Sequence, residues 1–203
     1  MVNTIKTVIF DLWWVYFTDG TKYAIETISS RYNISKENVQ EVLKGDLWTQ
    51  YRIWKLTADE FWKKAKEFRN IDVSSKELSN IWLQEYTLIP WTSDIVDRLK
   101  NSLYEIIFLS DNVQERIDFL EKKYPFLHKF NGWVFSHIAK TRKPDPVIYE
   151  LALAEAINSS HECVYVDDKE ELLEPAKALG MSTIHFKHPE QLEKELKKLW
   201  LTF

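Results

Sequence analysis

The sequence has little glycine and almost no cysteine. It holds 4 glycines and 1 cysteine among 203 residues, whereas a domain of this size carries roughly 14 glycines at an average frequency of about 7%. One cysteine excludes a disulfide within the chain, and Cys163 lies in the apolar run CVYV, which is typical of a buried, inert thiol. Tryptophan deviates in the other direction, with 9 residues. The composition therefore has less glycine, the smallest residue, and more tryptophan, the largest, than an average domain.

Long apolar runs and long blocks of like charge are also missing. No segment approaches 18 consecutive apolar residues, and the N-terminus enters a strand-like run at once, without the pattern of a signal peptide. The formal net charge is -4, from 27 basic and 31 acidic side chains. These features argue against nucleic acid or an anionic membrane as a partner. We therefore expect a cytoplasmic protein.

Short apolar runs alternate with amphipathic stretches along most of the chain, which predicts right-handed βαβ units and an α/β fold with an open parallel sheet. The final helix is expected to pack on the edge of that sheet. The expected strands are Thr4 to Phe10, Glu105 to Leu109, Trp133 to Ser136, Glu162 to Val166 and Ser182 to Phe186. The expected helices are Ser93 to Asn101, Val113 to Lys123, Pro146 to Ile157, Leu172 to Leu179 and Glu190 to Trp200.

An all-helical segment interrupts this alternation after the first strand. Residues 18–89 contain no comparable strand run, and the segments TADE from Thr57 and SSKE from Ser74 both fit a capping box at a helix start. We therefore predict a core of residues 1–17 and 90–203 and a helical cap of residues 18–89. This order places the cap over the carboxyl edge of the sheet, where open α/β sheets bind ligands.

Four polar features follow the ends of expected strands and so share that edge. They are Asp11, the triplet Ser110, Asp111 and Asn112, then Lys143, and finally the pair Asp167 and Asp168. Each feature alone has an ordinary explanation as a turn residue, a helix N-cap or a solvated side chain, and that explanation is favoured for any one of them.

Taken together, the same features describe a phosphoryl-transfer site. A carboxylate can accept a phosphoryl group and so divide hydrolysis into the formation and breakdown of an acyl phosphate. Further carboxylates beside it would repel it unless they shared a hard cation, and Mg²⁺ with oxygen ligands suits such a cluster. A lysine, a hydroxyl and loop N–H groups then balance the charge on the transferring oxygens.

At these residues the sequence resembles the haloacid dehalogenase superfamily, in its branch with a helical cap inserted after the first motif. The four motifs of that family are matched in order by VIFDLWWV, IFLSDN, KTRKPDPVIYELAL and VYVDDKEELLEPAKALGM. The resemblance covers the chain apart from the variable cap. It implies a phosphatase-like hydrolase, with Mg²⁺ as cofactor and a small phosphorylated metabolite as substrate.

The resemblance also implies roles for individual residues. Asp11 would be the nucleophile, Ser110 and Lys143 would be catalytic phosphate binders, and Asp111 and Asn112 would also bind the phosphate. The metal ligands would be Asp11, the backbone carbonyl of Trp13, and Asp167 with Asp168.

Two tryptophans depart from the family pattern directly after the nucleophile. Trp13 occupies the position where most phosphatases of the family carry an acid/base aspartate, and the loss of such a group costs about 10²- to 10⁴-fold in rate. Trp14 falls where the family prefers glycine, as do Trp54 and Trp91, and this matches the shortage of glycine. Either the chain has diverged and these side chains fill the core and the cap interface, or glycines have been replaced. A positive φ at Trp13, Trp14 or Trp91 would indicate a position built for glycine.

Three functions stay open on the sequence. The first is Mg²⁺-dependent hydrolysis of a small phosphomonoester through an aspartyl-phosphate on Asp11, impaired by Trp13. The second is dehalogenation of a 2-haloacid. Trp13 resembles the aromatic residue that dehalogenating members of the family carry two positions after the nucleophile, but that branch resembles a metal-free one and has no need of Asp167 and Asp168. The third is a non-catalytic protein that binds metal or ligand. The oligomeric state is open between monomer and homodimer.

Overall fold

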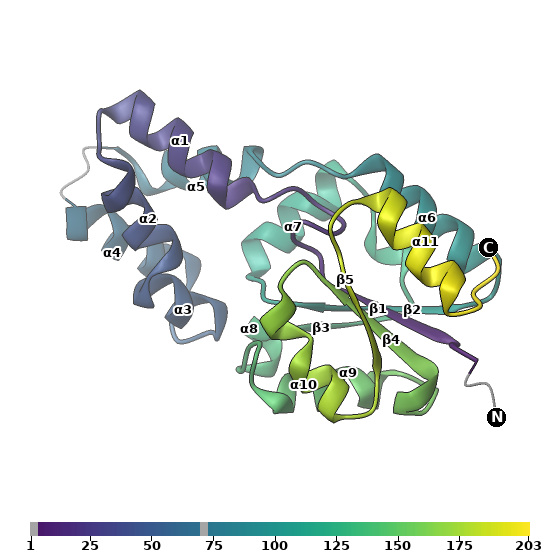
Figure 1. Cartoon of the computed structure of the whole chain (residues 1–203). Helices are drawn as coiled ribbons and strands as arrows, with labels where there is room; N and C mark the ends of the chain where they lie inside the picture. The colour runs from purple at the N-terminus through teal and green to yellow at the C-terminus, as the bar shows by residue number, and fades with distance from the viewer. Residues whose placement is uncertain (1–3, 70–72) are drawn as a thin grey trace.

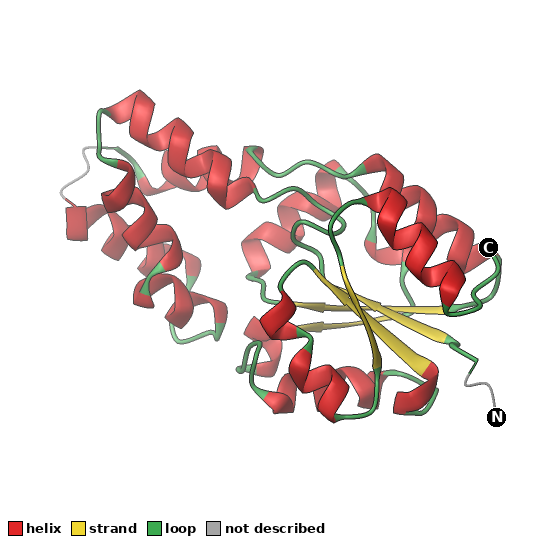
Figure 2. Ribbon diagram, in the orientation of Figure 1, coloured by secondary structure: helices red, strands yellow, loops and turns green. Residues whose placement is uncertain are grey.

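The structure is a computed structural model that describes residues 4–69 and 73–203. Within them, five parallel strands form one sheet in the order β3-β2-β1-β4-β5, and helices lie on both sides of the sheet (Figure 2). The predicted α/β fold with an open parallel sheet is therefore confirmed, and β1 lies at its centre. The strands are β1 (Thr7–Phe10), β2 (Glu105–Ser110), β3 (Gly132–Phe135), β4 (Cys163–Asp167) and β5 (Ser182–His185).

Helices cover both faces of the sheet because its strands alternate apolar side chains between two cores. Val8 and Phe10 of β1 face the larger core, beneath α6, α7 and α11, whereas Ile9 faces a smaller core beneath α9 and α10 (Figure 1). The helices of this body are α6 (Pro90–Asn101), α7 (Gln114–Lys123), α8 (Ser136–Ala139), α9 (Pro146–Glu155), α10 (Glu174–Ala178) and α11 (Pro189–Lys198), with short 3-10 turns η1 (Leu127–Lys129), η2 (Ser160–Glu162) and η3 (Glu170–Leu172).

A layer of helices lies between β1 and α6 in the chain and beside the carboxyl ends of the strands in space (Figure 1). At Thr57 the capping box is complete, since Thr57 and Glu60 exchange hydrogen bonds between side chain and backbone. At Ser74 the side chain caps its helix, while Glu77 accepts a hydrogen bond from Tyr32. These helices are α1 (Gly20–Tyr32), α2 (Lys36–Lys44), α3 (Asp46–Arg52), α4 (Ala58–Arg69) and α5 (Ser75–Gln84).

Some element boundaries differ from the sequence prediction. The strand β1 begins at Thr7 instead of Thr4. The helix expected from Leu172 to Leu179 is divided into η3 and α10, and α10 carries Pro175 in its first turn, where proline needs no hydrogen-bond partner. The helix α6 begins at Pro90, three residues before the expected start at Ser93, because proline fits the first position of a helix.

Several large side chains have a left-handed backbone. Trp14 and Trp54 both have φ 61°, and Trp200 has φ 66°. Trp13 and Trp91 are not among the described residues with positive φ. Left-handed geometry is uncommon outside glycine and asparagine, and it places the Cβ of a bulky residue against its own backbone. The prediction of a position built for glycine is therefore confirmed at Trp14 by its positive φ and is wrong at Trp91 by the same criterion. Trp54, which also falls where the resembled family carries glycine, has a positive φ as well.

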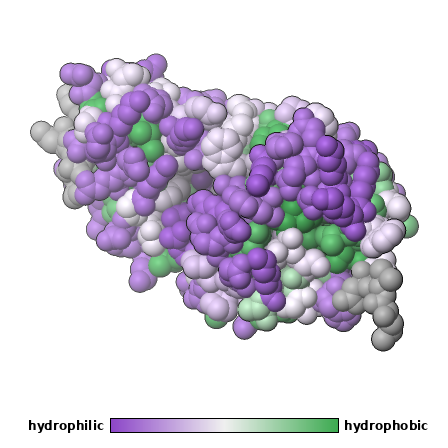
Figure 3. Space-filling view, viewed as in Figure 1, coloured by the Kyte–Doolittle hydropathy of each residue, from purple (hydrophilic) through white to green (hydrophobic). Residues whose placement is uncertain are grey.

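The surface and the buried thiol agree with the composition. Hydrophilic residues cover most of the visible face over both the helical layer and the α/β body (Figure 3). None of the helices in the described part of the chain has the length and apolarity needed to span a membrane. Cys163 is buried, and burial raises the pKa of its thiol.

Candidate active site

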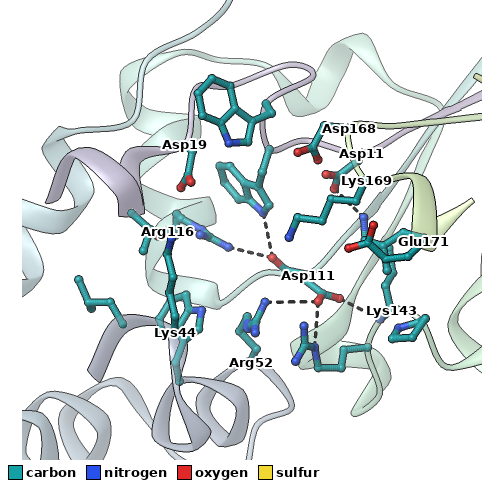
Figure 4. Close-up of a pocket in the computed structure, with 18 of the residues that line it drawn as sticks. Asp11, Asp19, Lys44, Arg52, Asp111, Arg116, Lys143, Asp168, Lys169 and Glu171 are labelled. Carbon is teal, nitrogen blue, oxygen red and sulfur yellow. Dashed lines mark hydrogen bonds and ion pairs between the residues drawn. The ribbon is translucent and has the colours of Figure 1, made fainter. Parts of the chain in front are cut away.

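Three carboxylates meet at the carboxyl edge of the sheet. Asp11 directly follows β1, Asp167 ends the neighbouring β4, and Asp168 is the next residue. One oxygen from each of them lies within 4.8 Å of the others. Asp11 and Asp167 are buried, and Asp168 is half-buried at the wall of a pocket (Figure 4). The parallel pairing of β1 with β4 is what brings residues 156 positions apart in the chain together.

A buried lysine lies among these carboxylates. The ammonium group of Lys143 is 2.9 Å from Asp11 Oδ1 and 2.7 Å from Asp167 Oδ2. It also donates a hydrogen bond of 3.0 Å to the Tyr165 hydroxyl, which in turn donates to Asp167. Asp167 further accepts from the backbone N–H of Lys169. Asp167 is therefore held on both oxygens, whereas the Asp168 carboxylate is directed to the pocket.

The charges in this cluster do not balance. Burial raises the pKa of Asp11 to about 7, with repulsion from Asp167 and Asp168 adding to the rise and attraction to Lys143 opposing it. Burial and repulsion from Asp167 raise the pKa of Asp168 to about 6. Burial lowers the pKa of Lys143, but attraction to Asp11 and Asp167 outweighs it and holds that pKa well above its ordinary value. One ammonium group thus faces three carboxylates.

The residues present fit a hard divalent cation with oxygen ligands. The excess of negative charge among Asp11, Asp167 and Asp168 is what such a cation compensates, and carboxylate oxygens are the ligands that Mg²⁺ uses in proteins. Asp11 Oδ1, although near Lys143, makes no hydrogen bond of acceptable geometry within the described residues, so a lone pair remains to bind a ligand.

The predicted triplet after β2 divides into three environments. Ser110 is buried, and its hydroxyl has no hydrogen-bond partner among the described residues, which leaves it able to donate to a ligand oxygen. Asn112 is also buried, but its backbone N–H donates to Ser136, and its side-chain oxygen accepts from Val113 and Arg116. Asn112 thus organises the start of α7. Its predicted contact with phosphate stays a prediction.

Asp111 joins three segments at the wall of the pocket. Its carboxylate accepts from the backbone N–H of Lys143 at 3.1 Å and from Arg142 Nε at 3.0 Å (Figure 4). It also accepts a longer contact of 3.4 Å from Arg52, at the end of α3 (Figure 4). The helical layer and the sheet edge are therefore linked through one carboxylate.

Trp13 is packed at the position that most phosphatases of the resembled family give to an aspartate. Its indole N–H donates a hydrogen bond of 2.9 Å to the Asp111 carbonyl. The guanidinium group of Arg116 lies 3.7 Å from the centre of its ring, and Tyr86 packs edge-on at 4.9 Å. The indole side chain offers no proton to a leaving group, because its one N–H is engaged and is a very weak acid.

A pocket of about 550 Å³ opens between the helical layer and the sheet edge. Of the predicted residues, Asp11, Trp13, Asp111, Lys143 and Asp168 line it. Basic side chains that the sequence analysis did not single out line it too: Lys44, Arg52, Arg116, Arg142 and Lys169. Arg142 and Lys169 adjoin motif residues and could have been found from the sequence. Lys44 and Arg52 come from α2 and α3, which carry no motif.

An open parallel sheet with a nucleophile-like aspartate after its central strand, and with a lysine and two further carboxylates around it, defines a hydrolase of the haloacid dehalogenase type. The model of the haloacid dehalogenase-like hydrolase family matches residues 13–186, and the chain belongs to this family. The resemblance derived from the four motifs is thereby confirmed.

Curated relatives cover most of the chain. A protein of Dictyostelium discoideum that has not been characterised is 28% identical over 162 residues, which is 75% of this chain and 68% of the relative. The sesquiterpene phosphatase of Aspergillus oryzae is 23% identical over 188 residues and aligns over 91% of both chains.

Solved structures share the fold. An enzyme of this family from Bacteroides thetaiotaomicron, crystallised with magnesium and inorganic phosphate, superposes with a TM-score of 0.79 at 24% identity, covering 90% of this chain and 94% of the other. An L-2-haloacid dehalogenase from Xanthobacter autotrophicus, with chloropropionic acid covalently bound, gives a TM-score of 0.63 at 18% identity, covering 96% and 83%. Both likenesses concern the fold alone.

Proposed function

We propose that the protein is a Mg²⁺-dependent hydrolase of a small phosphomonoester. The observation that carries this proposal is the cluster of Asp11, Asp167 and Asp168 within 4.8 Å, with Lys143 among them. The magnesium and phosphate in the Bacteroides enzyme and the activity named for the Aspergillus relative support it. In this proposal, residues 18–89 form the cap over the site.

The chemistry would proceed in two steps. A carboxylate oxygen of Asp11 attacks phosphorus, the bond from phosphorus to the ester oxygen breaks, and the alcohol leaves as Asp11 becomes an aspartyl-phosphate. Water then attacks the same phosphorus, and inorganic phosphate leaves with the carboxylate of Asp11 restored. Lys143 and the hydroxyl of Ser110, which has no hydrogen-bond partner among the described residues, would stabilise the charge on the phosphoryl oxygens.

Mg²⁺ bound by Asp11, Asp168 and the Trp13 carbonyl would compensate the carboxylates and orient the phosphate. Asp167 is better placed as a support than as a free ligand, because Lys143, Tyr165 and the Lys169 N–H already hold both of its oxygens. The dehalogenase alternative gives no use to this acidic cluster.

The non-catalytic alternative has one observation in its favour, which is the packing of Trp13. No carboxyl group stands at position 13, and the alcohol must take its proton from solvent. We infer slow turnover of esters with poor leaving groups instead of a complete loss of activity, because the nucleophile and Lys143 remain paired at 2.9 Å.

The deciding experiment measures phosphate release from a phosphomonoester with Mg²⁺ and with EDTA, alongside formation of a beryllofluoride adduct on Asp11. We expect hydrolysis with Mg²⁺ only, and none from Asp11→Asn. Glu171→Gln, a carboxylate of the same pocket outside the cluster, is the matched control. Magnesium binding without hydrolysis or an adduct would establish the non-catalytic protein, and chloride release from 2-chloropropionate in EDTA would establish the dehalogenase.

A further inference from the structure

The wall of the pocket on the side of the helical layer is richer in positive charge than a single phosphate requires. Arg52 and Arg142 share one carboxylate, that of Asp111. Arg116 is buried, and within the described part of the chain it donates its hydrogen bonds to neutral groups, namely the Asn112 side-chain oxygen, the Tyr86 hydroxyl and the Asp111 carbonyl. Buried cations are ordinarily paired with anions, so this wall has room for one more negative charge.

Arg52 has donor capacity to spare. Its side chain is 16% exposed, its Nε has no hydrogen-bond partner among the described residues, and its contact with Asp111 is long, at 3.4 Å. Burial lowers the pKa of Arg52 to about 10, attraction to Asp111 opposes this, and Arg142 and Arg116 repel it. Arg52 therefore lies near two other guanidinium groups and keeps an N–H that no described residue accepts. Both features favour the binding of an anion there.

We propose that the substrate carries a second anionic group besides its phosphate, and that Arg52 together with Arg142 binds that group. This proposal rests on the proposed function, because the phosphate is assigned to the Asp11 end of the same pocket. Figure 4 shows the two ends, with Asp11 and Asp168 on one side and Arg52 across Asp111 on the other. A carboxylate or a second phosphate satisfies the guanidinium groups, which match planar or tetrahedral oxyanions.

The test compares ligands that differ in the second group only. Phosphoglycolate is set against 2-hydroxyethyl phosphate, and propane-1,3-diol bisphosphate against 3-hydroxypropyl phosphate. We expect the member with a second anionic group, in at least one pair, to have a tenfold or greater advantage in kcat/KM, expressed mainly in KM. Arg52→Gln should abolish that advantage, so that both members of the pair are hydrolysed alike. Arg98→Gln, an arginine of α6 paired with Glu193 outside the pocket, is the matched control and should alter neither pair.

Equilibrium binding separates this proposal from the proposed function. The same ligands are titrated calorimetrically into Asp11→Asn with Mg²⁺ present, so that no turnover is needed. If the ligand with two anionic groups binds more tightly than its partner, and this difference is lost in Asp11→Asn/Arg52→Gln, the subsite is supported even if the wild-type chain hydrolyses nothing. Equal binding of both members of each pair, or an equal loss for both on Arg52→Gln, overturns it while leaving phosphatase activity untouched. The pair that shows the preference identifies the group as carboxylate or phosphate.

A second and independent observation concerns the tryptophans, which divide into two groups. Trp48, Trp62 and Trp82 are buried in one aromatic cluster, as tryptophan ordinarily is. The others include Trp14, Trp54 and Trp200, which are 37%, 48% and 72% exposed and have left-handed φ. These three make up half of the six described residues other than glycine with positive φ.

We infer that positions 14, 54 and 200 are glycine positions, and that their codons specify glycine in the organism that makes the protein. A left-handed backbone is unfavourable for a residue with a Cβ, which approaches its own carbonyl oxygen, and is tolerated by glycine. The chain is short of glycine, with 4, and rich in tryptophan, with 9. The triplet UGA is read as tryptophan by some genetic codes and as glycine by others, so a single codon would lower the glycine count and raise the tryptophan count together.

Peptide mass spectrometry of the protein isolated from its own organism decides the matter directly. Glycine at positions 14, 54 and 200, with tryptophan retained at 48, 62 and 82, supports the inference, and tryptophan at any of the first three overturns it for that position. Thermal unfolding of the recombinant chain is the second readout. Trp14→Gly and Trp54→Gly should each raise the midpoint by a few degrees, whereas Trp82→Gly, a fully buried control, should lower it.

Discussion

Position 13 carries the aromatic ring of Trp13, where a side chain able to protonate a poor leaving group, such as an alkoxide, would assist hydrolysis. Trp13 donates its only N–H to the Asp111 carbonyl and is covered by Arg116. We therefore expect aryl phosphates, whose leaving phenolates need little proton transfer, to be hydrolysed far faster than alkyl phosphates. Trp13→Asp should raise the turnover of alkyl phosphates by about 10²- to 10⁴-fold and change that of aryl phosphates little. Steady-state kinetics on both ester classes measures this.

The matched control for that substitution is Trp13→Asn, which has the size of aspartate but no transferable proton. It should open the same space beside Arg116 without the gain on alkyl esters. Similar rates for alkyl and aryl esters in the wild-type chain would contradict the assigned role of position 13.

His137 in α8 gives the chain a pH-dependent stability. It is buried, with its ring nitrogens near the Asn112 carbonyl and the Gln114 side chain, and burial lowers its pKa to about 4. An unfolded histidine titrates near pKa 6.5, so between these values the unfolded chain binds a proton that the folded chain does not. The contribution of His137 to stability should therefore fall as the pH falls from about 6.5 towards 4, while the raised pKa values of Asp11 and Asp168 act in the opposite direction. In urea unfolding, His137→Gln should therefore gain stability relative to the wild-type chain as the pH falls through this range; a difference that does not change with pH would refute the assignment.

At the scale of elements, helix starts carry a measurable part of the stability. The Thr57 hydroxyl accepts from the Glu60 N–H, and the Glu60 carboxylate accepts from the Thr57 N–H, which together close the start of α4. Thr57→Ala should lower the free energy of unfolding by about 1 kcal/mol, whereas Thr57→Ser should keep most of it. Chemical denaturation compares the two variants. Equal stability of both would show that the helical layer does not depend on this cap.

At the scale of the whole molecule, the metal site links the ends of β1 and β4, so its occupancy should stabilise the entire fold. Mg²⁺ at about 100 times its dissociation constant should add about 2.7 kcal/mol to the free energy of unfolding. Asp168→Asn should lose that response, and it should raise stability without metal because it removes a repelled carboxylate. Calorimetry in Mg²⁺ and in EDTA measures both effects. Glu171→Gln should keep the full response, and an identical loss there would contradict the assignment of ligands.

The sequence by itself determined the fold class, the family and the acidic centre of the site. Buried parallel strands have a local signature in short β-branched runs, and Asp11, Lys143, Asp167 and Asp168 stand at fixed places relative to those runs. Once the strands are known to be parallel, their carboxyl ends must share an edge, so the meeting of these residues follows from chain connectivity. The helical layer was equally readable from its capping sequences.

Only the tertiary structure decided what surrounds that centre. Arg52 and Arg116 line the pocket, and each contacts a residue far away in the chain: Asp111 for Arg52, and Tyr86 for Arg116. No local sequence pattern marks such contacts. The hydrogen bond from Lys143 to Asp167, and the one from the Asn112 N–H to Ser136, likewise arise from contacts between segments far apart in the chain. Backbone dihedral angles belong to the same level. The left-handed geometry at Trp14 comes from the turn that follows β1, because the path of the chain there fixes φ whatever side chain the position carries.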